Sequence, residues 1–246
     1  MIGTCDMGIF DLIGKNRKKQ LNDDKSDSEY YLDAHELWDY HIGGYSNPSQ
    51  AIKLLSKSIL LNPKKEEAYH SRGLAYCQLN KYDLAIEDHS TAINIDPSNH
   101  LYYMNRGRAY AAIKKYQKAL DDFNKAINLK PRDPSGYLAR AVIYWDMGKH
   151  KEALDDDTRL IEIDPQNCEY YLCRGWHYGA LKKYKNAIDD FSKAIFINPN
   201  HVKLYIYRGN LYEIIGDNQN MYRDFKKASE LGDSSWLESA VKRGLC

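Results

Sequence analysis

The sequence predicts an all-α protein, a solenoid of helix-turn-helix repeats closed by a C-terminal capping helix. Three observations carry this prediction, and all three share an interval of 34 residues. Proline recurs at Pro63, Pro97, Pro131, Pro165 and Pro199. Arginine followed by glycine or alanine recurs once in each interval, and so do two tyrosines seven residues apart. Self-similarity at a fixed period of about 20 to 50 residues indicates stacked units of supersecondary structure.

Each repeat is predicted to contain two helices. In the first helix, Tyr69, Arg72 and Tyr76 lie on one face, because helical neighbours are three and four residues apart. A polar turn follows, and the second helix begins near Tyr82 and presents Ala85 to its partner. The closing proline ends the second helix, since proline cannot continue a helix and disfavours helical geometry at the residue before it.

This pattern resembles that of the tetratricopeptide repeat family. Members of that family have an aromatic, a small and a second aromatic residue in the first helix, then alanines and a closing proline in the second. The resemblance covers residues 32–235. It implies a right-handed superhelix of helix pairs with a concave groove lined by the first helices. It does not identify a ligand, because a fold alone does not fix function.

The repeats divide the chain into three parts. Residues 1–28 are predicted to be a flexible N-terminal segment, because a charged stretch without periodicity cannot bury a core. Residues 236–246 are predicted to be the capping helix. Between them, residues 29–235 hold six repeats: 32–65, 66–99, 100–133, 134–167, 168–201 and 202–235. The first and last repeats depart from the pattern, as terminal repeats do because one of their faces lacks a neighbour.

The N-terminal end of the array carries signals for helix starts. Ser26 and Glu29 have the spacing of a capping box before a first helix predicted over residues 29–44. Asn47 and Pro48 predict the cap and first residue of the next helix.

The C-terminal end departs from the pattern in its own way. Met221 replaces the alanine that recurs in the second helix of the other repeats, and Asp233 replaces the proline that closes them. Ser235 and Glu238 are predicted to cap a last helix that presents one apolar side.

A column of aspartates lies 16 residues after the arginine column. In an antiparallel helix pair, this separation places the two side chains at the same height. The first repeat lacks both charges and has Trp38 and Leu54 in their places. A charge in a packing face needs a partner, so the sequence predicts structural ion pairs rather than a phosphate site. The predicted pairs are Arg72 with Asp88, Arg106 with Asp122, Arg140 with Asp156, Arg174 with Asp190, and Arg208 with Asp224.

Composition argues against several classes of protein. A formal net charge of +1 gives no basic footprint for nucleic acid, and no run approaches the roughly 18 apolar residues of a membrane span. Asp6 and Asp11 interrupt the N-terminal apolar residues, which disfavours a secretory signal. Five cysteines without CxxC spacing predict free thiols in a reducing compartment, and hence a cytoplasmic protein.

No motif for catalysis, a cofactor or a metal is present in the sequence. The eight histidines include no pair at i, i+3 or i+4, and phosphate loops and nucleophile elbows are missing. Neither an enzyme nor a cofactor nor a metal site is therefore predicted. His150 and Asp157 replace tyrosine and phenylalanine of the sister repeats. A buried hydrogen bond between them is predicted, and a pH-sensitive or ligand-contacting site is the alternative.

The neighbouring face of each first helix is predicted to line the groove. Its middle and C-terminal portion is apolar and includes two tryptophans one repeat apart. Exposed apolar surface marks binding sites, and tryptophan is a favoured anchor. The predicted groove residues are Met104, Arg108, Leu138, Val142, Trp145, Leu172, Trp176 and Ile206. Burial of both tryptophans against neighbouring helices is the alternative.

The sequence therefore predicts a non-enzymatic scaffold or adaptor that binds a protein or peptide segment through apolar anchors. Binding of nucleic acid and stable membrane insertion are not expected. The alternative is a co-chaperone-like or membrane-surface assembly factor that uses an apolar patch at residues 9–13 or a basic edge of turn lysines. That edge comprises Lys81, Lys115, Lys149 and Lys183. Some family members bind acidic C-terminal tails through a clamp of lysine and asparagine side chains, and only Asn105 matches that clamp here. Self-association through the N-terminal patch is left open.

Overall fold

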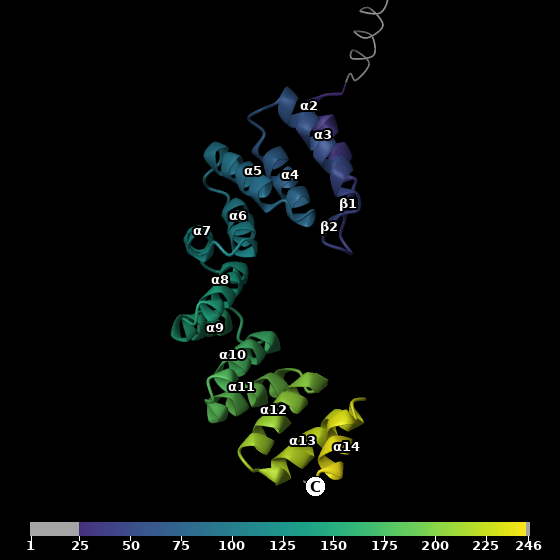
Figure 1. The fold of residues 1–246 in the computed structure, drawn as a ribbon, viewed down its shortest axis with the longest axis vertical. Coiled ribbons are helices and arrows are strands. Elements are labelled where there is room, and N and C mark those ends of the chain that lie inside the picture. The colour runs from purple at the N-terminus through teal and green to yellow at the C-terminus, as the bar shows by residue number, and fades with distance from the viewer. Residues whose placement is uncertain (1–24, 245–246) are drawn as a thin grey trace, which may run out of the picture. The chain divides into compact units, whose positions relative to one another are not determined.

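The computed structural model describes residues 25–244, which contain thirteen α-helices and one two-stranded hairpin. Successive helices form pairs joined by short turns (Figure 1). The predicted class, an all-α array of helix-turn-helix repeats with a final capping helix, is confirmed. The structure falls into two compact units that divide after Ala109. The apolar patch at residues 9–13 and most of the N-terminal segment lie outside the described residues.

The N-terminal unit begins with helix α2 and a hairpin and continues to α6, which runs across the division. Its elements are α2 (Asp27–His35), β1 (Trp38–Asp39), β2 (Gly44–Tyr45), α3 (Pro48–Leu61), α4 (Glu66–Gln78), α5 (Tyr82–Ile95) and α6 (His100–Ala112).

The C-terminal unit contains the remaining helices. They are α7 (Tyr116–Leu129), α8 (Pro134–Asp146), α9 (His150–Ile163), α10 (Cys168–Ala180), α11 (Tyr184–Ile197), α12 (Val202–Ile214), α13 (Asn218–Glu230) and α14 (Ser235–Lys242). Between residues 25 and 244, no helix is both long and apolar enough to span a membrane.

The turn within each repeat depends on one residue with a left-handed backbone. This residue is Gly148 (φ 72°) or Gly216 (φ 79°) in two repeats, and Asn80 (φ 58°), Lys114 (φ 59°) or Lys182 (φ 59°) in three others. Glycine adopts this conformation without a steric penalty, whereas a lysine Cβ crowds the following carbonyl oxygen. The two lysine turns are therefore strained.

The corner between repeats is held by a tyrosine hydroxyl. Tyr205 donates to the carbonyl oxygen of Pro199, six residues earlier, at 2.9 Å. Tyr103, Tyr137 and Tyr171 donate in the same way to the prolines six residues before them. The tyrosine and proline columns thus act together, because proline ends one helix and the hydroxyl satisfies its carbonyl group.

Four arginines of the column each join three helices, and Arg140 is an example. Arg140 on α8 donates from Nε and Nη2 to both carboxylate oxygens of Asp156 on α9, at 2.9 and 2.6 Å. Its Nη1 donates to Oδ1 of Asn124 on α7, at 2.5 Å. Burial raises the pKa of the Asp156 carboxyl, and Arg140 opposes that shift. Two charge-assisted bonds in parallel fix both distance and orientation, so the arginine ties its own helix pair together and links it to the preceding repeat.

The same arrangement recurs along the chain, with a polar residue 16 positions before each arginine. It joins Arg72 to Asp88 and Ser56, Arg174 to Asp190 and Thr158, and Arg208 to Asp224 and Ser192. Arg106 donates to Ser90, and Asp122 is buried. Sequence reasoning finds the aspartates and misses the polar residues of the preceding repeat.

The first repeat differs from the prediction. Its first helix ends at His35, and a hairpin of β1 and β2 replaces the predicted continuation. Gly43 has a φ of 62°, which permits the tight reversal. Gln78 of α4 then bonds to the N–H and the carbonyl of Tyr45, at 2.9 and 2.8 Å. The ring of Trp38 packs edge-on against Tyr45, so this tryptophan supports the hairpin instead of extending the helix.

The predicted helix starts of the first repeat form. The N–H of Glu29 donates to Oγ of Ser26 at 3.2 Å, and the N–H of Ser26 donates to the Glu29 carboxylate at 2.7 Å. Asn47 caps α3 by accepting from the N–H of Gln50 at 3.0 Å, with Pro48 as the first helical residue.

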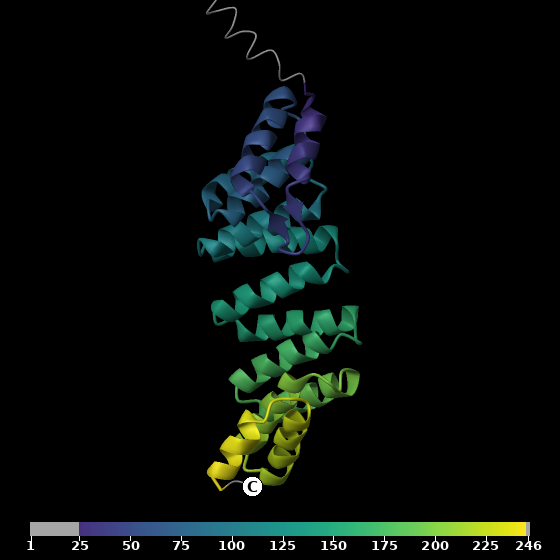
Figure 2. The ribbon, with the colours of Figure 1, turned by 90° about the vertical axis from the view of Figure 1, so that its right-hand side faces the viewer.

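The C-terminal helix α14 packs on α13 (Figure 2). It buries Ala240. The predicted cap is wrong, because Ser235 is already the first residue of α14. Its hydroxyl donates to Asp233, and Glu238 accepts from the hydroxyl of Ser234 instead. The cap prediction places the helix start one residue too late.

Candidate functional site

Exposed apolar side chains gather on the first helices of the C-terminal unit. On α8, Leu138 is 37% exposed and Val142 is 57% exposed, and on α10 Trp176 is 50% exposed. Leu172, one turn before Trp176, is half-buried. Packing within the repeats does not account for this surface, because the tyrosine and arginine columns occupy a different face of each helix.

Three hollows surround α10, and together they form what we call the α10 groove. One of about 250 Å³ lies between α8 and α10, and two of about 280 and 450 Å³ lie between α10 and α12. Neighbouring hollows share the wall residues Leu172, Trp176 and Tyr207. The hollows therefore form one surface that extends over three repeats.

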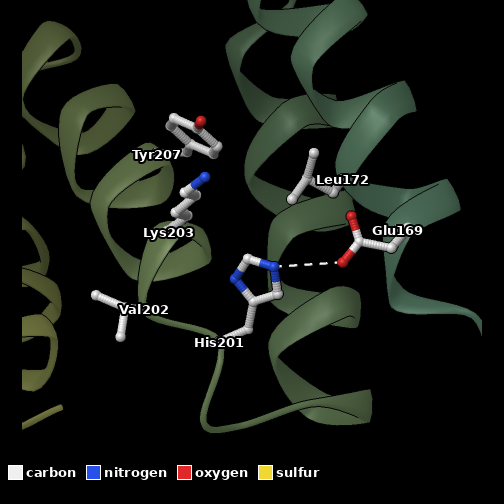
Figure 3. Close-up of a pocket in the computed structure, with 6 residues that line it drawn as sticks. All are labelled: Glu169, Leu172, His201, Val202, Lys203 and Tyr207. Carbon is white, nitrogen blue, oxygen red and sulfur yellow. Dashed lines mark ion pairs between the residues drawn. The ribbon is translucent and has the colours of Figure 1, made fainter. Parts of the chain in front are cut away.

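The hollow of about 450 Å³ is the polar end of the groove. Nε2 of His201 lies 3.3 Å from Oε1 of Glu169 (Figure 3). Lys203 and Tyr207 border the same hollow from α12. Glu169 is exposed, so water screens this ion pair and its contribution to stability is small. These groups can contact polar atoms of a ligand.

The hollow between α8 and α10, which we call the Asp157 pocket, lies where repeat four departs from the sequence of its sister repeats. In repeat five the ring of Phe191 lies 2.8 Å from where a Cβ on Gly175 would be, so ring and glycine backbone touch. Repeat six has the same contact. Repeat four has Asp157 in place of the phenylalanine and Ala141 in place of the glycine. Both replacements line the pocket.

Asp157 pairs with His177 of the next repeat, and the predicted pairing with His150 is wrong. Nδ1 of His177 donates to Oδ2 of Asp157 at 2.5 Å, and the imidazole stacks on Trp145 with ring centroids 4.3 Å apart. Nδ1 of His150 has no hydrogen-bond partner among the described residues. Residues seven apart on one helix are separated by about 10 Å along its axis, whereas α10 packs directly on α9.

The other predicted groove residues differ in how far the structure exposes them. Met104 is 2% exposed and Ile206 is 7% exposed, so neither can contact a ligand, and Ile206 is instead part of an apolar cluster. Arg108 is exposed on α6. Trp145 is half-buried between the rings of His150 and His177. Of the two tryptophans, Trp176 is therefore the accessible one.

The Asp157 pocket lacks an activated nucleophile. Cys173 lines it together with Asp157 and His177. Burial raises the pKa of the Cys173 thiol to about 11, so the thiol stays protonated at neutral pH and cannot act as a thiolate. No group of three or more histidine, cysteine or acidic side chains within residues 25–244 could hold a metal ion. This arrangement is suited to binding.

Sequence reasoning overlooks His177, although a signal was present. The equivalent positions of other repeats hold Ala75, Ala109, Ile143 and Leu211, so a histidine departs from an apolar column just as Asp157 does. Tyr207 carries no such signal, because its column is mixed in size and polarity.

The N-terminal unit has a separate hollow of about 250 Å³, bordered in part by His70. The ring of His70 lies 5.2 Å from that of His89, and both nitrogens of His89 are buried without a partner among the described residues. Burial lowers the pKa of His70 to about 4 and that of His89 to about 3. His89 touches Gly73 as phenylalanine does elsewhere, so it acts as a neutral packing ring.

The lysines of the basic turn edge have local contacts. Lys149 lies over the ring of Tyr144, and Lys183 lies over that of Tyr178, each with Nζ 6.0 Å from the centroid. All four turn lysines are exposed. Contact with a tyrosine ring explains the lysine at two of these four positions, and no acidic binding partner is needed to explain them.

Models of repeat families match consecutive parts of the chain. A TPR repeat model matches residues 73–113 and 107–148, and two tetratricopeptide repeat models match residues 134–167 and 168–201. The matches together span residues 73–201, which is more than half of the chain. None of the curated protein sequences matches it.

Several solved structures are similar in fold. The crystal structure of YrrB, a TPR protein with an unusual peptide-binding site, has a TM-score of 0.60 at 18% identity, covering 77% of this chain and 97% of that one. MamA from Desulfovibrio magneticus RS-1 has a TM-score of 0.63 at 16% identity, with coverages of 71% and 96%. TTC0263, a TPR protein of Thermus thermophilus, has a TM-score of 0.55 at 18% identity, with coverages of 76% and 98%. At such identities the likeness shows the fold alone.

Proposed function

The chain belongs to the tetratricopeptide repeat family, and we propose that it is a non-enzymatic interaction scaffold that binds a peptide segment of a partner protein in the α10 groove. The scaffold would comprise the six repeats between residues 32 and 235 and the capping helix. The family is generally one of protein-interaction modules, which supports the class of function and leaves the ligand open.

The observation that carries this proposal is the exposure of apolar side chains at the groove. A tryptophan that is 50% exposed stands between two hollows, and Leu138 and Val142 extend the apolar surface onto α8. Contiguous apolar surface on a water-soluble domain marks interaction sites. Tryptophan in such a surface is a favoured anchor, because it supplies a large contact area at a low entropy cost.

The proposed occupant is a segment with two apolar anchors and a polar continuation. The two hollows beside Trp176 are largely apolar, and each is large enough for one side chain. The third hollow offers Lys203, His201 and Glu169 to polar groups. YrrB is a repeat protein with a peptide-binding site, which supports a peptide as the class of ligand.

A peptide-display selection against the full-length chain tests the proposal. We expect enrichment of peptides with two apolar residues, and a loss of at least about tenfold in affinity in the variant Val142→Glu/Trp176→Glu, because a charge in an anchor pocket removes the contact and remains desolvated. The matched control is Phe196→Glu on α11, which changes a side chain that is 79% exposed and lines none of the hollows described above. Circular dichroism of each variant checks the fold.

The proposal fails if no peptide is enriched over an unrelated repeat protein, or if the selected peptides bind the groove variant as tightly as the parent chain. Sedimentation of the chain alone at several concentrations separates partner binding from self-association.

A further inference from the structure

The hollow of the N-terminal unit, which we call the hairpin pocket, is rich in aromatic side chains. Five of the residues that border it carry a tyrosine or tryptophan ring: Tyr31, Trp38, Tyr40, Tyr45 and Tyr102. Three of these five come from the hairpin of β1 and β2, which no other repeat in the described part of the chain contains. The departure of the first repeat from helical structure therefore coincides with this aromatic lining.

Three of the five rings are accessible to a ligand. Tyr40 is 88% exposed, and Trp38 and Tyr31 are partly exposed. Tyr45 and Tyr102 are almost completely buried, and Trp38 packs edge-on against Tyr45. The buried rings thus act as packing support, and a ligand would meet the accessible ones.

The charge of the hairpin pocket is negative. Among the described residues that border it, Glu67 is the one that is charged at neutral pH. Burial lowers the pKa of His35 and of His70, the latter to about 4, so both imidazoles are neutral at pH 7. The Glu67 side chain is exposed and forms no ion pair with another residue between 25 and 244. Burial raises the pKa of Tyr102 to about 12, and the charges of Glu66 and Glu67 add to that shift, so their negative potential reaches the aromatic lining.

One of the accessible rings already contacts a cation of the chain. Nζ of Lys65 lies 4.7 Å from the ring centroid of Tyr31 and 3.3 Å from Oδ2 of Asp27. This ammonium group is therefore paired, and Lys65 does not border the hairpin pocket. The accessible rings that remain open are those of Trp38 and Tyr40.

Open aromatic rings beside an unpaired carboxylate favour a cationic ligand, because the face of an aromatic ring is electrostatically negative. A guanidinium group suits both features. It is planar and weakly hydrated, it stacks on aromatic rings, and it can donate two parallel hydrogen bonds to one carboxylate. A primary ammonium group is more strongly hydrated, and a quaternary ammonium group has no N–H to donate to Glu67.

We propose that the hairpin pocket binds an arginine side chain of a partner protein segment. The guanidinium group stacks on the ring of Trp38 or Tyr40 and donates to the carboxylate of Glu67. The pocket volume of about 250 Å³ accommodates one such side chain. This second site lies within the N-terminal unit and does not depend on the α10 groove.

The test uses single-residue probes and the full-length chain. The amides of N-acetylated arginine, citrulline, lysine and trimethyl-lysine are titrated while the indole N–H signals of the four tryptophans are followed by NMR. We expect the arginine probe to shift the signal of Trp38 and to leave those of Trp145, Trp176 and Trp236 in place. Citrulline has the shape of arginine without its charge and should bind at least about tenfold more weakly, and lysine about threefold more weakly.

Two pairs of variants assign the contacts. Glu67→Gln should lower the affinity for the arginine probe about fivefold. Its matched control is Glu66→Gln, which removes the same charge from the same turn of α4 but does not border the pocket, so the affinity should stay within about twofold of the parent value. Tyr40→Leu should weaken binding about threefold, whereas Tyr40→Phe keeps the ring and should not. Circular dichroism of each variant checks the fold.

The chain's own basic cluster is the competing occupant, and it comprises Lys15, Arg17, Lys18 and Lys19. The full-length variant Lys15→Gln/Arg17→Gln/Lys18→Gln/Lys19→Gln should bind the arginine probe as the parent chain does. A marked gain in affinity would show that the cluster competes for the pocket, which would overturn the assignment to a partner.

Three other results overturn the inference. They are equal affinity for the arginine and citrulline probes, tighter binding of either lysine probe than of the arginine probe, and equal losses in Glu66→Gln and Glu67→Gln.

Discussion

Nδ1 of His177 donates to the carboxylate of Asp157, which lies twenty residues earlier on the preceding repeat. The ring that makes this bond is held from one side by Trp145. In a solenoid each repeat contacts only its neighbours, so a buried acid has partners available from its own repeat or from the adjacent one. Here the adjacent repeat supplies the partner, and the pair borders the Asp157 pocket of the α10 groove.

The arginine network leads to a prediction about stability. Arg140→Leu leaves the Asp156 carboxylate buried without its partner and should cost about 3–5 kcal/mol in the free energy of unfolding. Arg140→Leu/Asp156→Leu should recover much of that loss, because two leucines leave no buried charge without a partner. Urea unfolding of the two single variants and the double variant measures the coupling. Destabilisation of the double variant equal to the sum of the singles would contradict the pairing.

The buried histidine of repeat two predicts a dependence of stability on pH. Burial lowers the pKa of His89 to about 3, with smaller effects from His70 and Arg106, whereas the unfolded chain has an ordinary value near 6.5. Below pH 6.5 the unfolded state binds the proton first, so stability falls as the pH falls. The contribution of His89 to that loss should reach about 2 kcal/mol at pH 5.

His89→Phe is the variant that tests this dependence, since phenylalanine occupies the same column in three sister repeats. Its free energy of unfolding should change less than that of the parent chain between pH 7 and pH 5. Some dependence should remain, because burial also lowers the pKa of His70, to about 4. Parallel pH profiles for parent and variant would rule out the assignment to His89.

The strained turn before α11 predicts a stabilising substitution. Lys182 has a φ of 59°, and relief of a left-handed non-glycine residue is worth up to about 1–2 kcal/mol before the entropy cost of glycine is subtracted. Lys182→Gly should therefore raise the melting temperature, as Gly148 and Gly216 already serve this turn elsewhere. The matched control is Lys183→Gly, whose φ of −85° needs no glycine and which should lower it. A lower melting temperature for both variants would count against strain at Lys182.

The different positions of the two groove tryptophans predict their accessibility to a quencher. Trp176 is half-exposed, whereas Trp145 is packed between two imidazoles. Trp176→Phe should therefore lower the iodide Stern–Volmer constant of the total fluorescence, and Trp145→Phe should raise it. The two remaining tryptophans contribute equally to both variants and cancel in the comparison. Changes of the same sign would mean that the two rings are equally covered.

The residues that recur every 34 positions predict much of the architecture, but they do not predict which side chains line the groove. In the first repeat, Trp38 replaces the arginine and Leu54 replaces the aspartate. The joint replacement of both charges indicates, from one chain alone, that the arginine and aspartate of a repeat contact each other. Met104 and Ile206 belong to the face predicted to line the groove, and yet both are buried. The position of a residue along its helix determines the direction of its side chain. Whether that side chain is buried depends on how closely the neighbouring helix packs there.

The sequence by itself determined the alternation of first and second helices and many of the residues that pack within a repeat, because these depend on spacing along one helix pair. Only the tertiary structure decided which polar groups meet across repeats. Asn124 bonds to Arg140 and Asp157 bonds to His177, and neither pair is related by a helical spacing. Such contacts depend on how far one helix pair is rotated against the next, and that rotation is set by the summed packing of whole faces rather than by any single motif.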